Sequence, residues 1–140
     1  MMLYRMAYYI LLFTLFVAGC GQHQADKGDE ASDEPAGPAQ IAFEQVYYDF
    51  GDLQQGEKVS YVFEFKNEGG SPLVIRDAAA SCGCTVPRYN KEPIQPGEEG
   101  SIEVVFDSSG RRGNQYKTVI VKTNTPKREV RLTIKANVIV

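Results

Sequence analysis

Apolar and polar residues alternate with a period of two through most of the chain beyond residue 43. In KVSYVFEFKN (58–67) one side of the pattern is apolar, with Val59, Tyr61, Phe63 and Phe65, and Val62 is the one apolar residue on the other side. SIEVVFD and EVRLTIKANVIV repeat the alternation, the latter with Val130, Leu132, Ile134, Ala136 and Val138 in phase. A period of two predicts strands with one buried face.

Turn residues separate these runs at intervals of about ten positions, as in NEGGSP (67–72), QPGEEG (95–100), DSSGRRGNQ and NTPK. With FEQVYYDFGDL as a first strand and PLVIRDAA as another, the pattern predicts about seven strands and no helix. YKTVIVKTN is expected to be a central strand, but its apolar residues occupy both faces, so its register stays open. The predicted fold is an all-β, immunoglobulin-like β-sandwich. It is not of the antibody type, because the chain has no Trp and no distant cysteine pair.

The N-terminus, MMLYRMAYYILLFTLFVAGC, has the features of an export signal. Its apolar run from Ala7 to Ala18 is shorter than the roughly 20 residues that cross a bilayer as a helix. Val17-Ala18-Gly19-Cys20 resembles a bacterial lipobox, in which the chain is cut before the cysteine and the thiol receives a diacylglyceryl group. The alternative is an ordinary signal peptide followed by a cysteine without lipid.

Three segments are therefore expected: a lipoprotein signal peptide (1–19), a lipid-anchored acidic linker (20–42) and the sandwich domain (43–140). The linker is rich in Gly, Pro, Ala and acidic residues, so it is expected to be disordered. Gly21 after the lipidated cysteine favours the outer membrane, with the domain facing the periplasm or the cell surface. The acidic residues are either solvated linker charge or a surface-export signal.

The charge of the domain argues against nucleic-acid binding. From residue 43 onward there are 13 acidic and 13 basic residues, so no phosphate-tracking stripe is expected. Arg111-Arg112 and Lys127-Arg128 are interpreted as solvated charges at turns and strand edges.

Cys82 and Cys84 flank a glycine in SCGCTVP (81–87), and three roles are open for them. They serve a turn or packing role, oxidised or not, or they form a redox-sensitive pair, or they hold a thiophilic metal. A disulfide between them needs a bend at Gly83 and stabilises the chain little, because the closed loop is so short. Two thiolates suit Cu(I). Zinc is disfavoured because four ligands are needed and the only histidine, His23, lies in the linker.

No catalytic constellation is visible in the domain. It contains no histidine, which excludes Ser-His-Asp and Cys-His arrangements. Glu98 and Glu99 lie in a turn and are expected to be solvated rather than to act as an acid-base pair.

Several segments together carry a resemblance to a known family. They are Phe50-Gly51 with Gly56, FxFKNxGxxPLVI, SCGCTVP, IQPGEEGSIEVVFD and VKTNTPKREVRLTIKANV. In this order they resemble the bacterial lipoprotein family DUF 1573, which is similar to Hydin-type and major-sperm-protein-like immunoglobulin folds. The resemblance implies the sandwich fold and the envelope address, and it implies that the Cys82–Cys84 pair is not accidental. It implies no biochemical activity.

The sequence thus favours a non-catalytic, lipid-anchored binding or structural module of the cell envelope. Its expected partners are the membrane, through the N-terminal lipid, and an envelope protein or polymer. The alternative is a periplasmic redox or copper-handling protein that works through Cys82 and Cys84. No cofactor is expected, apart from Cu(I) in that alternative.

Overall fold

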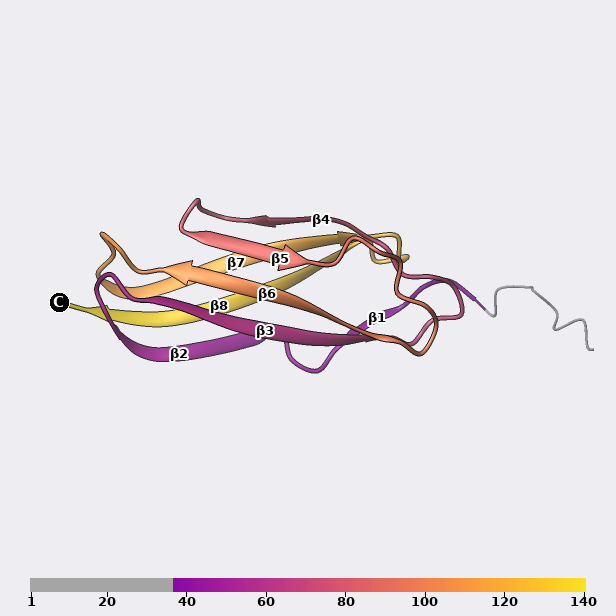
Figure 1. The fold of residues 1–140 in the computed structure, drawn as a ribbon, viewed down its shortest axis with the longest axis horizontal. Coiled ribbons are helices and arrows are strands. Elements are labelled where there is room, and N and C mark those ends of the chain that lie inside the picture. Colours follow the sequence, from indigo (N-terminus) through magenta and orange to yellow (C-terminus); the bar gives the residue numbers. More distant parts are fainter. Residues whose placement is uncertain (1–36) are drawn as a thin grey trace, which may run out of the picture. The chain divides into compact units, whose positions relative to one another are not determined.

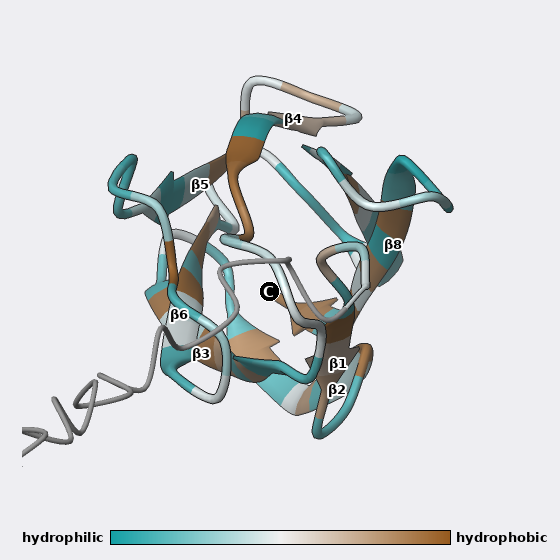
Figure 2. Ribbon diagram, turned by 90° about the vertical axis from the view of Figure 1, so that its right-hand side faces the viewer, coloured by the Kyte–Doolittle hydropathy of each residue, from teal (hydrophilic) through white to brown (hydrophobic). Residues whose placement is uncertain are grey.

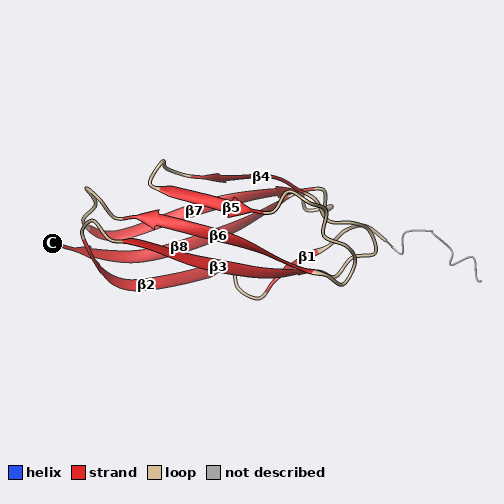
Figure 3. Cartoon of the chain, viewed as in Figure 1, coloured by secondary structure: helices blue, strands red, loops and turns tan. Residues whose placement is uncertain are grey.

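The computed structural model describes residues 37–140, and the regular elements of this part of the chain are all β-strands (Figure 3). The eight strands are β1 (Ile41–Phe43), β2 (Tyr47–Gln54), β3 (Lys58–Asn67), β4 (Ile75–Ala80), β5 (Thr85–Tyr89), β6 (Glu99–Asp107), β7 (Gly113–Thr123) and β8 (Glu129–Ile139). The described residues include no helix long and apolar enough to span a bilayer.

The strands form two four-stranded sheets, with the orders β1-β3-β6-β5 and β2-β8-β7-β4 (Figure 1). Neighbours pair antiparallel, except that β2 runs parallel to β8. If β1 and β2 are taken as one strand that is divided between the sheets, the order is that of a constant-type immunoglobulin domain. The predicted all-β, immunoglobulin-like sandwich is therefore confirmed.

Alternate residues of the strands build the core between the sheets, and Figure 2, which looks along the strands, shows the apolar segments around a common interior. The predicted inward faces of β3, β6 and β8 are confirmed, although Val59 and Tyr61 are only partly buried. Burying each large apolar side chain contributes roughly 1.5–3 kcal/mol. The largest buried apolar side chains are Phe63, Phe106, Leu73, Ile102 and Leu132.

The predicted first strand, FEQVYYDFGDL, is two strands. β1 pairs with β3 in one sheet and β2 pairs with β8 in the other, so the chain changes sheets between Phe43 and Tyr47. Alternation along the sequence does not reveal this change, because apolar residues continue on both sides of the break.

The β5 strand was not expected either. Its sequence TVPRY contains Pro87, which has no N–H for a sheet ladder. β5 pairs only with β6 and is an edge strand, where a proline is tolerated. Six strand segments were named from the sequence, and these two additional strands raise the number to eight, against the total of about seven that was expected.

The structure also fixes the register of β7. Val119 and Val121 are buried, while Tyr116 lies on the outer face with 61% of its surface exposed. Ile120 also points outward and is half-buried beside the exposed edge of β4. This outward apolar residue made the alternation ambiguous.

Packed residues begin before the expected boundary at residue 43. Ala39 is 3% exposed and belongs to the core, and β1 starts at Ile41. The last residues that we assigned to the linker are therefore part of the sandwich.

Candidate functional site

Cys20 and His23 lie outside the described residues. The lipidation of Cys20 and the signal and linker segments therefore stay predictions. Of the site residues that the sequence singled out, the structure describes Cys82 and Cys84.

Cys82 and Cys84 are joined by a disulfide across Gly83, with Cα atoms 5.3 Å apart. They lie in the short connection from β4 to β5, which carries the chain from one sheet to the other. Both cysteines are half-buried, and Gly83 is exposed. The pairing is therefore within the turn and does not link distant strands. Cu(I) binding by the reduced thiols stays a prediction.

The flanks of this turn are held by backbone hydrogen bonds. The Ser81 N–H donates to Thr118 O at 2.9 Å, and the Thr118 N–H donates to the Ser81 hydroxyl at 3.3 Å. On the other side the Asp107 N–H donates to Cys84 O at 2.9 Å. The turn is thus fastened to β7 and to β6 independently of the disulfide.

Thr85 places a buried hydroxyl against both sulfurs. Thr85 is 3% exposed, and its Oγ1 lies 3.6 Å from Cys82 Sγ and 3.9 Å from Cys84 Sγ. Among the described residues these sulfurs are the only hydrogen-bond partners of the hydroxyl.

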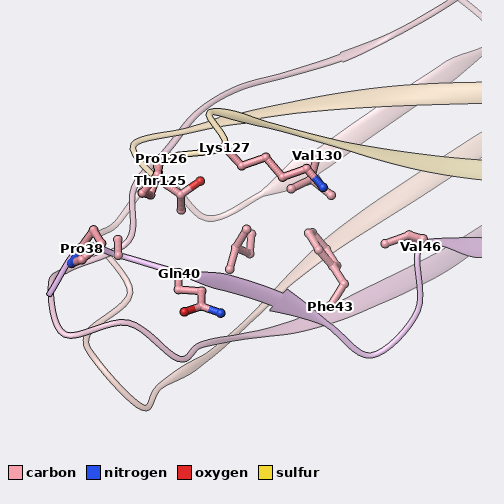
Figure 4. A pocket seen from close by; sticks show the side chains of 10 residues that line it. Pro38, Gln40, Phe43, Val46, Thr125, Pro126, Lys127 and Val130 are labelled. Atoms are coloured by element: carbon pink, nitrogen blue, oxygen red, sulfur yellow. The ribbon is translucent and has the colours of Figure 1, made fainter.

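A groove lies on the opposite side of the sandwich, where β1 and β2 separate. Its volume is about 460 Å³. β1 forms one wall, and the β7–β8 turn with the start of β8 forms the other (Figure 4). The lining is mostly apolar: Pro38, Ala39, Gln40, Ile41, Phe43, Val46, Thr125, Pro126, Lys127 and Val130.

The β1 wall presents unpaired backbone groups to this groove. Gln40 O accepts a bond from the Glu68 N–H at 2.9 Å, and the Glu44 N–H donates to Glu64 O at 3.2 Å. Backbone groups alternate between the two sides of a strand, so the even-numbered residues face β3. The N–H and C=O groups of Ile41 and Phe43 therefore point away from β3, toward the groove.

The β8 wall has a free edge as well. Thr133 donates its N–H to Val46 O at 2.8 Å, and the β2–β8 pairing begins at that position. On the other side of β8, Arg128 O accepts from the Thr123 N–H at 2.7 Å. By the same alternation the backbone groups of Arg131 face away from β7, and no described strand pairs with them.

A buried asparagine holds the β1 wall in place. Asn67 is fully buried, and its Nδ2 donates to Ser71 O at 2.9 Å and to Ile94 O at 3.0 Å. Its Oδ1 accepts from the Gln40 N–H at 3.3 Å and from the Gly69 N–H at 3.0 Å. Gly69 itself lies so close to the backbone of residues 38–40 that a Cβ would overlap it.

Beyond the groove, the same side of the sandwich is closed by aromatic rings. Tyr48 of β2 stacks on Tyr61 of β3 with ring centroids 3.7 Å apart, and Phe50 and Phe63 meet this pair edge to face. These contacts join the two sheets where β2 pairs with β8. The opening is therefore confined to the β1 half.

The charged residue in the groove is Lys127, which is exposed on the β7–β8 turn and forms no salt bridge among the described residues. The next residue, Arg128, has a positive φ of 59°, which L-residues rarely adopt. An unpaired cation beside an apolar wall favours a ligand that carries a carboxylate.

The ion pairs among the described residues lie outside the groove. Lys135 contacts Asp49 at 2.8 Å and lowers the pKa of that carboxyl. Hydrogen bonds from Ser109, with Lys58 3.1 Å away, lower the pKa of Asp107 to about 2. The described residues contain no cluster of three His, Cys, Asp or Glu side chains that could hold a metal ion.

The sequence did not single out the groove or Thr85. The groove combines residues 38–46 with residues 125–130, from opposite ends of the domain, and periodicity does not show that these segments meet. Thr85 follows Cys84 directly, but its burial beside the sulfurs depends on the bend at Gly83.

The sheet order, the divided first strand and the absence of helices from residues 37–140 define an immunoglobulin-like sandwich. The chain belongs to the family described as a protein of unknown function (DUF1573), whose model matches residues 41–138. This confirms the resemblance seen in the sequence.

Solved structures share the fold at low identity. A protein of unknown function from Porphyromonas gingivalis W83 has a TM-score of 0.65 and 19% identity over 78% of this chain and 51% of its own. The seventh PapD-like domain of human CEP192 has a TM-score of 0.58 and 12% identity over 75% of this chain and 87% of its own. The secreted serine protease VesC from Vibrio cholerae has a TM-score of 0.53 and 12% identity over 79% of this chain.

This chain spans about half of the P. gingivalis protein and only 25% of VesC. At these identities the likeness concerns the fold alone. No curated protein sequence matches the chain.

Proposed function

We propose that this protein is a non-catalytic, lipid-anchored module of the bacterial cell envelope that binds an extended peptide segment of an envelope protein in the groove beside β1. The observation that carries the proposal is the unpaired edge of β1 on one wall of the groove, with the free edge of β8 at Arg131 next to Val130 of the other wall.

An extended peptide satisfies both features of the groove. Its backbone pairs with a free strand edge, and its alternate side chains enter the apolar lining around Phe43 and Val130. Lys127 at the rim favours an acidic residue in the bound segment. The edge of β1 is only three residues long, so the free edge of β8 beside Arg131 is expected to contribute pairing as well.

The anchor is supported by the sequence. The lipobox-like Val17–Cys20 places a cysteine at the expected mature N-terminus, and the acidic linker separates it from the domain. Several acyl chains hold a protein firmly, since each buried methylene contributes roughly 0.8 kcal/mol. The expected location is the outer membrane, with the domain facing the periplasm or the cell surface.

The lack of catalysis is supported by composition. No histidine follows residue 23. The groove is lined by apolar side chains, one amide, one hydroxyl and one lysine, a set without a paired acid and base.

A matched pair of valines tests the groove. Val46 lies in the groove and is 45% exposed, whereas Val62 lies on the outer face of β3 and is 43% exposed. The full chain carrying a photo-crosslinking amino acid at either position is irradiated in envelope preparations, and the adducts are identified by mass spectrometry. We expect peptide adducts at position 46 and not at position 62.

A second measurement tests the mode of binding. Peptides identified at position 46 are synthesised, and hydrogen exchange of the full chain is measured with each. Strand addition protects the amides of Ile41, Phe43 and Arg131, and Val130→Asp abolishes the protection. Equal adducts at the two valines, adducts with glycan only, or binding that leaves these amides exposed would each contradict peptide binding in the groove.

The anchor is tested separately through Cys20. The wild-type chain is expected to incorporate a labelled palmitate and to sediment with membranes, whereas Cys20→Ser loses both properties. An unlabelled wild-type protein would show that the anchor is wrong while leaving the groove proposal intact.

A further inference from the structure

We propose that Cys82 and Cys84 form a thiol–disulfide exchange site for an external dithiol, with Cys82 as the sulfur that bonds the incoming thiol and Thr85 as the residue that stabilises the reduced pair. This site is separate from the groove and does not depend on peptide binding.

A structural role explains the disulfide poorly. Closing a loop of three residues contributes roughly 1.6 kcal/mol by the loop-entropy relation, before any native strain is subtracted. The turn is already fastened by the bonds of Ser81 to Thr118 and of Asp107 to Cys84. The S–S bond can therefore open while its two flanks stay in place.

The turn is open to an approaching thiol. Gly83 is exposed, and no heavy atom outside its chain neighbours lies within 4 Å of the position that a Cβ there would occupy. Cys84 packs against the hydrophobic core, whereas Cys82 does not belong to that cluster. Access therefore favours attack on Cys82, with Cys84 as the leaving sulfur.

Thr85 distinguishes the two redox states. Its buried hydroxyl has only the disulfide sulfurs as partners among the described residues, and these are weak acceptors. A thiolate is a much stronger acceptor, because hydrogen bonds to charged groups are about twice as strong as neutral ones. The hydroxyl therefore gains a better bond when the pair is reduced. Thr85 is a positioning residue that favours the open form.

The exchange proceeds in two balanced steps. A thiolate of the external dithiol attacks Cys82 Sγ and forms a mixed disulfide, while the Cys82–Cys84 bond breaks and Cys84 leaves as a thiolate that accepts a hydrogen bond from Thr85 Oγ1. The second external thiol loses its proton and attacks its own partner sulfur, which releases Cys82 as a thiolate that is protonated in turn. The external dithiol is oxidised by two electrons to a disulfide, and the cysteine pair is reduced to one thiol, at Cys82, and one thiolate, at Cys84, beside the Thr85 hydroxyl.

The equilibrium is tested with the full chain carrying Cys20→Ser, in buffers of reduced and oxidised dithiothreitol. The two thiols are counted by maleimide labelling and mass spectrometry, and circular dichroism follows the fold. We expect reversible reduction without loss of β structure. Thr85→Val should lower the equilibrium constant for reduction about tenfold, and Thr85→Ser should restore it. Wild-type equilibria in Thr85→Val, or reduction only on unfolding, would overturn the proposal.

The identity of the attacked sulfur is tested without changing Thr85. Single-cysteine chains, in which Cys20→Ser is combined with Cys84→Ser or with Cys82→Ser, are mixed with oxidised glutathione, and mixed-disulfide formation is timed. Cys82 in the first chain is expected to react at least about tenfold faster than Cys84 in the second. Equal rates, or a faster Cys84, would show that Cys82 is not the entry point.

Discussion

The chain passes from one sheet to the other in different ways on the two long sides of the sandwich. On the side of β4 and β5 the passage is the short turn at residues 81–84, fastened to both sheets and closed by a disulfide. On the side of β1 and β2 the passage divides one strand between the sheets, which leaves the groove. A tight passage exposes reactive sulfur atoms but little apolar surface, whereas the divided strand exposes apolar surface and unpaired backbone.

The difference shows which contacts keep a sandwich closed. Below the groove, where β2 pairs with β8, the stacked Tyr48 and Tyr61 join the sheets. Beside β1 no ring pair of the described residues spans the gap, because Phe43 packs on Phe65 within its own sheet. The groove stays open because the chain passes from one sheet to the other between β1 and β2. Asn67 holds the start of β1 in place through its hydrogen bond with Gln40.

The strongest test of the comparison removes the support of the groove wall. Asn67→Ala deletes four hydrogen bonds and leaves buried backbone groups unpaired, so we expect the free energy of unfolding to fall by about 3 kcal/mol. Urea denaturation measures the loss. Asn114→Ala, at an exposed position of β7, is the control and should stay within about 0.5 kcal/mol of wild type. A small effect at Asn67 would show that the wall is held by other contacts.

Two glycines sharpen the contrast between the sides. A Cβ at Gly69 would overlap the backbone of residues 38–40, whereas a Cβ at Gly83 would meet open space. Gly69→Ala is expected to displace the start of β1, to destabilise the protein by about 2 kcal/mol and to speed hydrogen exchange at Ala42. Gly83→Ala should leave both measurements near wild type. The reverse order of effects would contradict the close backbone contact at Gly69 and the open space at Gly83.

Removing the disulfide should change stability less than either groove substitution. The Cys82→Ser, Cys84→Ser double variant is expected to lose at most about 1.6 kcal/mol in urea denaturation, because the loop is short and its flanks are held by hydrogen bonds. Cross-linking from position 46 should be unchanged. A loss above about 3 kcal/mol would show that the disulfide is a structural staple after all.

The sequence predicted the parts of the fold that depend on local alternation. The inward faces of β3, β6 and β8 follow from a period of two, and the proximity of Cys82 and Cys84 follows from their spacing. The division between β1 and β2 was missed, because apolar residues continue through residues 41–54 in both phases. β5 was missed because its run TVPRY is short and is interrupted by Pro87, although an edge strand tolerates a proline.

The candidate sites were less predictable for a physical reason. The groove depends on the meeting of residues 38–46 with residues 125–130, which is set by strand pairing over the whole domain. The role of Thr85 depends on burial, because the same hydroxyl in water would gain nothing from a thiolate that it could not gain from solvent. The lipidation of Cys20, which stays a prediction, depends on a local motif alone, so long-range packing does not enter it.

The smallest expected effect concerns acid stability beside the disulfide turn. Hydrogen bonds from Ser109, followed by the contact with Lys58, lower the pKa of Asp107 from its ordinary value of 3.8 to about 2. A depressed carboxyl pKa stabilises the folded state above the unfolded pKa, and this contribution is lost as the pH falls through the folded pKa. Asp107→Asn should therefore be slightly less stable than wild type above about pH 4, and the difference should close between about pH 4 and pH 2. Urea denaturation of both chains across this range measures it, and a difference that persists at pH 2 would show that the asparagine disturbs the turn by another route than charge.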